Sequence, residues 1–353
     1  MKSSGIGGQA VIEGVMMKNK DKYAVAVRKP DNEIEVVVND CNSLSDKNKI
    51  FKLPIIRGVV NFVDSLVTGM KTLTYSASFF EDEEDEDKSD KTDNNSEKKV
   101  QENIKQSTEH NTENQESDVK ESVKENKANN KPAKAKNPEV EDKKEKVIMA
   151  GTVALSIVMA VAIFMVLPYF ISRFFSLFVK NETVLIILEG IIRVSIFIIY
   201  VKLISLLDDI KRVYMYHGAE HKCINCIEHG LELTVENVMK SSKEHKRCGT
   251  SFMLIVMCIS IIFFMFIRVD SPLLRLLLRI VLVPVIAGVS YEVLKLAGNT
   301  DSKFMDLVSR PGLMLQHLTT SEPDESMVEV AIASVEAVFD WRSYIENLKK
   351  EEK

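Results

Sequence analysis

The sequence predicts a mainly α-helical, polytopic membrane protein with four transmembrane helices, a small N-terminal β-hairpin module and a cytoplasmic metal-site segment. Three observations support this: long uncharged apolar runs, histidines and cysteines crowded between two of them, and two short β-branched runs near the start. In chain order we expect a small soluble α/β module (1–52), an amphipathic or membrane-associated helix (53–80) and a disordered charged linker (81–146). Transmembrane helices 1 and 2 (147–207), a cytoplasmic His/Cys segment (208–249), transmembrane helices 3 and 4 (250–297) and a cytoplasmic helical tail (298–353) follow.

The N-terminal module is predicted from two runs rich in valine. Tyr23–Val27 and Glu33–Val38 are separated by Lys29–Asn32, in which proline fixes φ and asparagine tolerates a left-handed backbone. This pattern predicts a β-hairpin. The glycines of Gly5–Gly14 match no phosphate-binding fingerprint, so we expect tight turns there rather than a ligand site.

The next segment, Pro54–Phe80, is apolar with regularly spaced polar residues. Arg57, Asp64 and Lys71 recur every seven residues and therefore lie near one face of a helix. This alignment favours an amphipathic helix lying on the membrane or packed on other helices. The segment is also long enough to span a bilayer, so a fifth transmembrane helix remains an alternative.

The four expected spans are the longest apolar runs of the chain. They follow a linker, residues 81–146, that has too few apolar residues to form a core. Each run has few or no charges and approaches the length that crosses a bilayer. Their bounds are Val147–Phe170, Val184–Leu207, Thr250–Ile267 and Pro272–Ala297.

Charged residues inside the second and fourth spans need partners, because a charge at membrane depth is costly. Glu189 and Arg193 stand four apart, the favourable order for a helix pair. Arg275 and Arg279 lie within the fourth span. We expect these residues to pair with one another or to extend toward the membrane surface. The alternative is a transporter that uses them for substrate or ion passage.

The distribution of lysine and arginine predicts the orientation. Basic residues are frequent just before the first span and between the second and third, whereas the other two loops carry few. The positive-inside rule then places both termini and the His/Cys segment in the cytoplasm.

The His/Cys segment is the expected functional centre. His217, Glu220 and His221 share one helical face, and His-x-x-Glu-His is the order of an inverted zinc-protease motif. In this arrangement the two histidines bind a divalent metal, with zinc expected, and His245 or Cys248 is the third ligand. Glu220 then acts as general base toward water in the open fourth position.

Two other interpretations of this segment remain open. Cys223-x-x-Cys226 and His245-x-x-Cys248 have the spacing of a closed, structural four-ligand zinc site. Alternatively, the polar side chains form a hydrogen-bonded network without metal. Lys222 and Arg247 are candidates for binding an anionic substrate or a lipid phosphate. Gln316, in the tail, is a further candidate for substrate binding because it could reach the metal segment.

Several stretches together resemble the YqhQ family of bacterial membrane proteins: Gly7–Met17, Tyr216–Lys222, Arg247–Ser251 and Pro311–Gln316 with the Leu318–Thr320 and Glu322–Pro323 segments. The resemblance covers nearly the whole chain except the linker. It implies a predicted metal-dependent enzyme of unknown reaction. In that family the position of Cys223 is often threonine, and the residue matching His245 is histidine, so the resemblance favours His217, Glu220, His221, His245 and Cys248 over the four-ligand site. It also implies that Gly7–Glu13 brings the N-terminal segment into the same site, with Glu13 as a further candidate ligand or acid, and that the protein lies in a bacterial inner membrane.

The functional expectation is therefore a metal-dependent, hydrolytic membrane enzyme acting on a membrane-proximal peptide or lipid-linked group. The alternative is a non-catalytic scaffold or regulator with a structural zinc site. The net charge of −5 comes mostly from the polar middle segment, and basic patches interleaved with aromatic residues are missing from the sequence, so we expect no nucleic-acid partner. The partner expected from composition is the lipid bilayer, and the sequence leaves the oligomeric state open.

Overall fold

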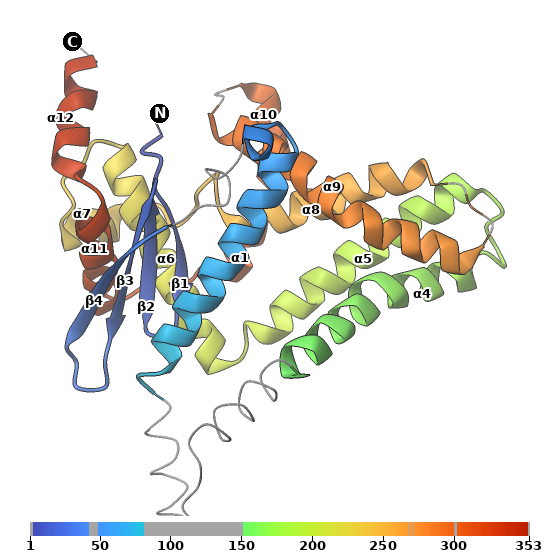
Figure 1. Cartoon of the computed structure of the whole chain (residues 1–353), viewed down its shortest axis with the longest axis horizontal. Coiled ribbons are helices and arrows are strands. Elements are labelled where there is room, and N and C mark those ends of the chain that lie inside the picture. The colour runs from blue at the N-terminus through green and yellow to red at the C-terminus, as the bar shows by residue number, and fades with distance from the viewer. Residues whose placement is uncertain are drawn as a thin grey trace, which may run out of the picture. The chain divides into compact units, whose positions relative to one another are not determined.

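The computed structural model describes residues 3–41, 49–80, 151–267, 269, 271–299 and 302–351. It is mainly helical, with one sheet near the N-terminus (Figure 1). Met1–Glu81 and Phe164–Lys353 pack into one unit, which contains every site discussed below. The linker expected at 81–146, and the first residues of the first expected span, lie outside the described residues.

The sheet has four antiparallel strands in the order β1-β2-β3-β4. The predicted hairpin is confirmed as the β3–β4 pair, in which Arg28 faces Ile34. The glycine-rich start does contain a tight turn, at Ile12–Glu13, but this turn joins two further strands that were not predicted from the sequence. Gly8 and Gly14 suit them, since a side chain would meet the carbonyl oxygens of neighbouring strands at 2.5 and 2.3 Å. The strands are β1 (Gly7–Val11), β2 (Gly14–Asn19), β3 (Lys22–Arg28) and β4 (Ile34–Asp40).

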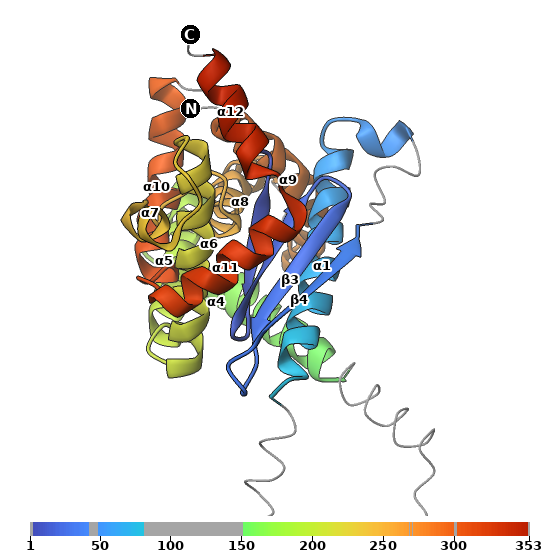
Figure 2. The ribbon, with the colours of Figure 1, turned by 90° about the vertical axis from the view of Figure 1, so that its left-hand side faces the viewer.

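Both faces of the sheet are covered. Helices α6 (Asp208–Glu228) and α11 (Glu325–Val338) pack on one face, where they bury the main hydrophobic core (Figure 2). The other face buries a smaller apolar cluster against Tyr75 and Phe79, at the end of α1. The sheet therefore holds α6, the helix of the His-x-x-Glu-His motif, in a fixed position.

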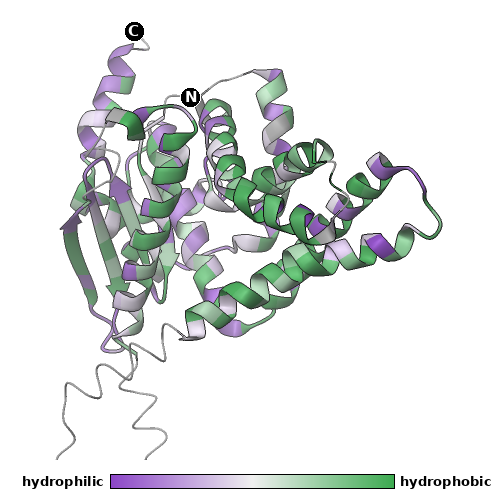
Figure 3. Ribbon diagram, turned by 45° about the vertical axis from the view of Figure 1, so that its right-hand side comes forward, coloured by the Kyte–Doolittle hydropathy of each residue, from purple (hydrophilic) through white to green (hydrophobic). Residues whose placement is uncertain are grey.

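A group of apolar helices forms the second part of this unit, and Figure 3 shows their hydrophobic character. Three helices are long and apolar enough to cross a membrane, Gly151–Phe175, Glu182–Ile204 and Leu273–Ala297. The expected third span is apolar but shorter, at 17 residues, so three spans rather than four are supported. The elements are η3 (Ala162–Val166), α4 (Leu167–Phe175), α5 (Glu182–Ile204), α8 (Gly249–Met265) and α9 (Pro272–Asn299).

Helix α1 (Ile56–Ala77) connects the sheet with these apolar helices, after a short 3-10 turn, η2 (Lys49–Lys52). Gly58 lies against Gly288 of α9, and Gly69 lies against Gln9 of β1. A side chain at Gly58 would come within 2.7 Å of the Gly288 carbonyl oxygen, so this close approach of two helix backbones needs glycine. The predicted helix is confirmed, and it is not among the three helices long and apolar enough to span.

The C-terminal tail is helical, as expected. Helix α10 (Lys303–Thr319) comes first, and α11 and α12 (Trp341–Glu351) follow it. Asp324 caps the start of α11, because its side chain accepts a hydrogen bond from Met327 N–H at 2.9 Å. The short helix α7 (Val235–Lys240) lies between α6 and the loop that leads to α8.

Candidate metal centre

The centre is built on the middle of α6. His217 and His221 are one helical turn apart, so their rings meet at a centroid distance of 4.4 Å. The opposite face of the same turns carries Cys223 and Ile227, which are fully buried in the core against the sheet. Core packing on one face thus fixes the direction in which the two histidines point.

Cys248 completes a three-residue group. One ligand atom each of His217, His221 and Cys248 lies within 4.8 Å of the others. Cys248 Sγ is 3.2 Å from His217 Nε2. A tetrahedral zinc ion with ordinary bond lengths separates nitrogen and sulfur ligands by roughly 3.6 Å. The donor set therefore fits a soft divalent metal. Among the residues that the structure describes, this is the only such group of three or more potential ligands.

Backbone carbonyls fix the orientation of both histidines. His217 Nδ1 is 2.8 Å from Thr319 O, and His221 Nδ1 is 2.6 Å from Lys243 O. A carbonyl accepts, so each Nδ1 carries the proton and each Nε2 presents its lone pair to the group. Metal-binding histidines are commonly held in this way through their second nitrogen.

Cys248 is held at the start of α8. It is the residue before the first helical turn, and its Sγ accepts a hydrogen bond from Thr250 N–H at 3.4 Å. Backbone N–H groups at a helix start favour negative charge, which suits a thiolate ligand. The fold thus brings a helix N-terminus to the two histidines of α6.

Glu220 lies beside this group with incomplete hydrogen bonding. It is 4% exposed, and burial raises the pKa of its carboxyl to about 7, while His217 and the Gly8 N–H act in the lowering direction. Its Oε2 atom is buried without a hydrogen-bond partner. Gly8 of β1 packs directly on the carboxyl group, so a side chain there would lie 3.0 Å from the Glu220 Cδ atom.

These residues line one pocket of about 440 Å³. Its walls come from four elements far apart in the chain: β1, Ser65 of α1, α6, and the segment that opens α8. The lining includes every member of the metal group as well as Glu220, His245 and Arg247. The arrangement therefore joins a set of metal donors to a space large enough for part of a substrate.

His245 and Arg247 belong to a neighbouring network around Glu228. The side chain of Glu228 is fully buried and forms an ion pair with Arg247. It also lies 3.5 Å from His245 Nε2 and accepts two hydrogen bonds from Ser4, both at 2.7 Å. Burial alone would raise the pKa of Glu228, but these partners together lower it to about 2. Burial also lowers the pKa of His245, so its neutral ring faces Glu228 and stands outside the three-ligand group.

Gln316 fixes the loop that carries His245. Its side chain accepts a hydrogen bond from His245 N–H and donates to His245 O, both at 2.8 Å. It also donates to Ser251 Oγ at 2.9 Å. Gln316 is fully buried and does not line the pocket, so its observed contacts are with the loop rather than with a substrate space.

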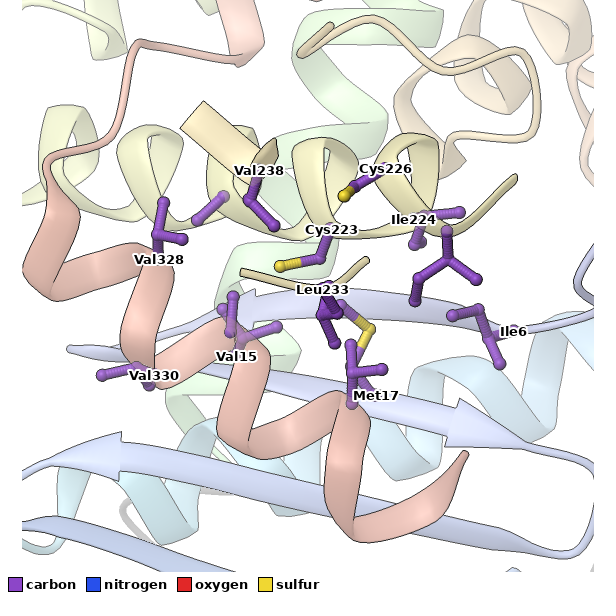
Figure 4. Close-up of a cluster of buried hydrophobic side chains, with 14 of the residues drawn as sticks. Ile6, Val15, Met17, Cys223, Ile224, Cys226, Leu233, Val238, Val328 and Val330 are labelled. Carbon is purple, nitrogen blue, oxygen red and sulfur yellow. The ribbon is translucent and has the colours of Figure 1, made fainter. Parts of the chain in front are cut away.

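The two remaining cysteines of the segment face the core. Figure 4 shows Cys223 and Cys226 among apolar side chains such as Val15 and Leu233. Cys226 Sγ lies 3.4 Å from Glu232 O. The four-ligand site requires Cys223 and Cys226 to lie beside Cys248, and the structure does not bring them together.

Two other predicted site residues are occupied elsewhere. The Lys222 ammonium donates to Met239 O and Ser241 O at 2.8 and 2.9 Å, and pairs with Glu322 at 3.0 Å. Glu13, at the β1–β2 turn, binds the Arg212 guanidinium at 2.5 Å. Neither residue lines the pocket.

The resemblance placed the segment that contains Gly8 at the site, and Gly7 to Ala10 do line the pocket, whereas sequence reasoning missed Glu228 and Ser4. One signal was available for Glu228, because it follows His221 by seven residues and therefore returns to the same helical face. The contacts of Ser4 and Gly8 depend on the placement of β1 beside α6, for which the sequence carries no local signal.

Two comparisons with known proteins agree with the motifs. Residues 53–341 match the model of a family described as "Protein of unknown function (DUF1385)". The chain is 30% identical over 334 residues to "Uncharacterized protein YqhQ" of Bacillus subtilis (strain 168), covering 93% of this chain and 90% of the relative. No solved structure matches the chain. The family match and the near full-length similarity show that this chain belongs to the YqhQ family.

Proposed function

We propose that the protein is a metal-dependent hydrolase whose site lies at one end of its apolar helices. The observation that carries this proposal is the group of His217, His221 and Cys248, with both histidines oriented through Nδ1, beside the unpartnered oxygen of Glu220. Three protein ligands leave one position of a tetrahedral ion open, which is the usual pattern of a catalytic rather than a structural zinc site.

A divalent ion held by these residues supplies Lewis-acid activation of water and of a substrate oxygen. Glu220 provides the proton acceptor. Its Gly8 contact fixes one side of the carboxyl group, and Oε2 remains without a partner among the described residues. A general base needs an oxygen that is free to accept a proton at the reacting position, and this geometry supplies it.

The position of the pocket favours a membrane-proximal substrate. The first turn of α8 and Ser65 of α1 form part of its wall, and α1 exposes apolar residues such as Leu66 and Met70 beside it. In a bilayer these residues suit the boundary between headgroups and acyl chains. We propose a peptide segment or a lipid-linked group at this boundary as the substrate, with the pocket on the cytoplasmic side of a bacterial inner membrane.

Metal content tests the ligand set. Elemental analysis of the full-length protein in detergent should give about one zinc per chain, and His217→Ala, His221→Ala and Cys248→Ala should each lose it. Cys226→Ala is the matched control, because its sulfur faces the core, and it should keep the metal. Loss in Cys226→Ala with retention in both histidine variants would instead indicate the structural four-ligand site.

Cobalt substitution then separates an open site from a closed one. The Co²⁺ protein should show a thiolate charge-transfer band that disappears in Cys248→Ala, and its spectrum should change when acetohydroxamate is added. A spectrum indifferent to hydroxamate would favour the non-catalytic scaffold or regulator. Glu220→Gln should keep the metal and lose turnover of a panel of membrane peptides and lipid-linked substrates, whereas a scaffold should tolerate this change.

A further inference from the structure

A second polar cavity lies at the other end of the apolar helices. It occupies about 100 Å³ between the end of α4, the beginnings of α5 and α9, and the residues that follow α8. Three arginines line it, Arg173, Arg275 and Arg279, together with Ser172 and Ser176. The 17-residue α8 runs from Cys248 toward this cavity, so about 25 Å of helix separates the cavity from the candidate metal centre.

Positive charge is in excess around this cavity. Glu189 accepts a hydrogen bond from Arg193 at 2.9 Å and from the two terminal nitrogens, Nη1 and Nη2, of Arg279 at 2.5 and 2.9 Å. All three side chains are at least nine-tenths buried, so one buried carboxylate faces two buried guanidiniums. The Nε atoms of both arginines have no hydrogen-bond partner. Because a buried charge without a counter-charge is costly, an anion near Arg279 is favoured.

The remaining charged residues of the cavity keep this excess. Arg275 donates to Val269 O, a neutral acceptor, at 2.6 Å. Arg173 is exposed at the rim and adds a third guanidinium on the same side. Glu182, also exposed, adds a single negative charge. Among the described residues that line the cavity, three arginines therefore face two glutamates, and Arg193 adds a further positive charge beside Glu189.

An apolar groove adjoins the polar cavity. It occupies about 250 Å³ and is lined by Val166, Phe170, Leu273 and Leu276. Tyr169 and Arg279 line both spaces, so the groove and the cavity meet at these residues. A small inorganic anion would use only the polar part, whereas a molecule with a phosphate and a hydrocarbon chain would use both.

The location also matches a lipid. The polar cavity collects residues from the end of one candidate span and from the beginnings of the other two. In a bilayer, the ends of spanning helices lie at the level of the phospholipid headgroups. The apolar groove runs beside the same helix ends, where an acyl chain begins.

We propose that this end of the helices binds an anionic phospholipid, with its phosphate at Arg173, Arg275 and Arg279 and one acyl chain in the groove. The contact at Arg279 supplies the counter-charge that Glu189 alone does not provide. This site is separate from the metal pocket, and the proposal does not depend on hydrolysis.

Native mass spectrometry of the full-length protein, titrated with phosphatidylglycerol, phosphatidylcholine or inorganic phosphate, tests the site. Phosphatidylglycerol should bind more tightly than phosphatidylcholine. Arg173→Gln and Arg275→Gln remove guanidiniums that do not pair with Glu189, and each should weaken phosphatidylglycerol binding roughly tenfold. Arg310→Gln is the matched control, because this exposed arginine lies on α10 away from the cavity, and it should leave binding unchanged.

Leu276→Trp fills the apolar groove and therefore distinguishes binding of a phospholipid from binding of inorganic phosphate. It should weaken phosphatidylglycerol binding and leave inorganic phosphate unaffected. Equal binding of both lipids, or unchanged binding in both arginine variants, would overturn the site. Inorganic phosphate binding as tightly as phosphatidylglycerol, with no effect of Leu276→Trp, would overturn its assignment to a lipid. Circular dichroism and elution volume confirm that each variant is folded.

Discussion

Two buried glutamates of α6, eight residues apart, occupy opposite electrostatic environments. Glu228 is surrounded by Arg247, His245 and Ser4, and its pKa falls to about 2. Glu220 has a buried oxygen without a partner, and its pKa rises to about 7. The partners of Glu228 compensate for its burial. The burial of Glu220 is not fully compensated, and this residue lies beside the three potential metal ligands. The difference shows that the fold satisfies one buried carboxylate and leaves an oxygen of the other without a partner.

The largest expected effect is on stability, and it should fall on Glu228 alone. Glu228→Gln leaves Arg247 and His245 without their charged partner and should lower the free energy of unfolding by about 3 kcal/mol. The thermal midpoint in detergent should fall by at least about 5 °C. Glu220→Gln, the matched control on the same helix, should leave the midpoint unchanged or raise it, because it removes a buried carboxyl that lacks a partner. Equal losses in both variants would contradict the distinction.

The pH dependence of stability sharpens the same comparison. The pKa of Glu228 is lowered in the folded protein from an ordinary value of 4.5 to about 2. The charge of Glu228 therefore contributes about 3 kcal/mol to the free energy of unfolding. This contribution is fully present above pH 4.5 and is lost as the pH falls toward 2. The midpoint difference between wild type and Glu228→Gln should shrink by about half between pH 7 and pH 3. A difference that stays constant over this range would show that Glu228 acts through packing rather than charge.

Local spacing predicted the part of the site that lies on one helix. His217, Glu220 and His221 are within one turn, so helical periodicity alone places them together. The third ligand was left open between His245 and Cys248, because both precede α8 in a loop whose path depends on tertiary contacts. In the structure Cys248 lies with the two histidines, whereas Gln316 holds the backbone of His245 and the His245 ring faces Glu228.

The fold shows the same division. Apolar periodicity and the turn at Lys29–Asn32 predicted helices α1, α5 and α9 and the β3–β4 hairpin. Strands β1 and β2 were missed because glycine disfavours strands when judged alone. Their glycines are explained by close contacts, such as Gly8 on Glu220, that only the folded chain shows.

An intermediate effect is expected for the loop support. Gln316→Ala removes three hydrogen bonds that hold the segment leading to Cys248, and should weaken metal affinity roughly tenfold without abolishing binding. Competition with a zinc chelator measures this change. Met314→Ala is the control, because this residue is 69% exposed on the same helix, and it should retain wild-type affinity. Unchanged affinity in Gln316→Ala would mean that the loop holds Cys248 without this support.

The smallest effect is expected from the core cysteine, and it extends the comparison from carboxylates to thiols. Cys223→Ala removes a fully buried sulfur from an apolar cluster and should cost about 1 kcal/mol of stability while one metal per chain is retained. Cys248→Ala makes the same chemical change at a sulfur that faces His217, and should lose the metal. Elemental analysis with a thermal melt of each variant separates the two outcomes. Metal loss in Cys223→Ala would mean that this thiol binds the ion. That result would refute the three-ligand site, in which the Cys223 sulfur stays in the apolar core.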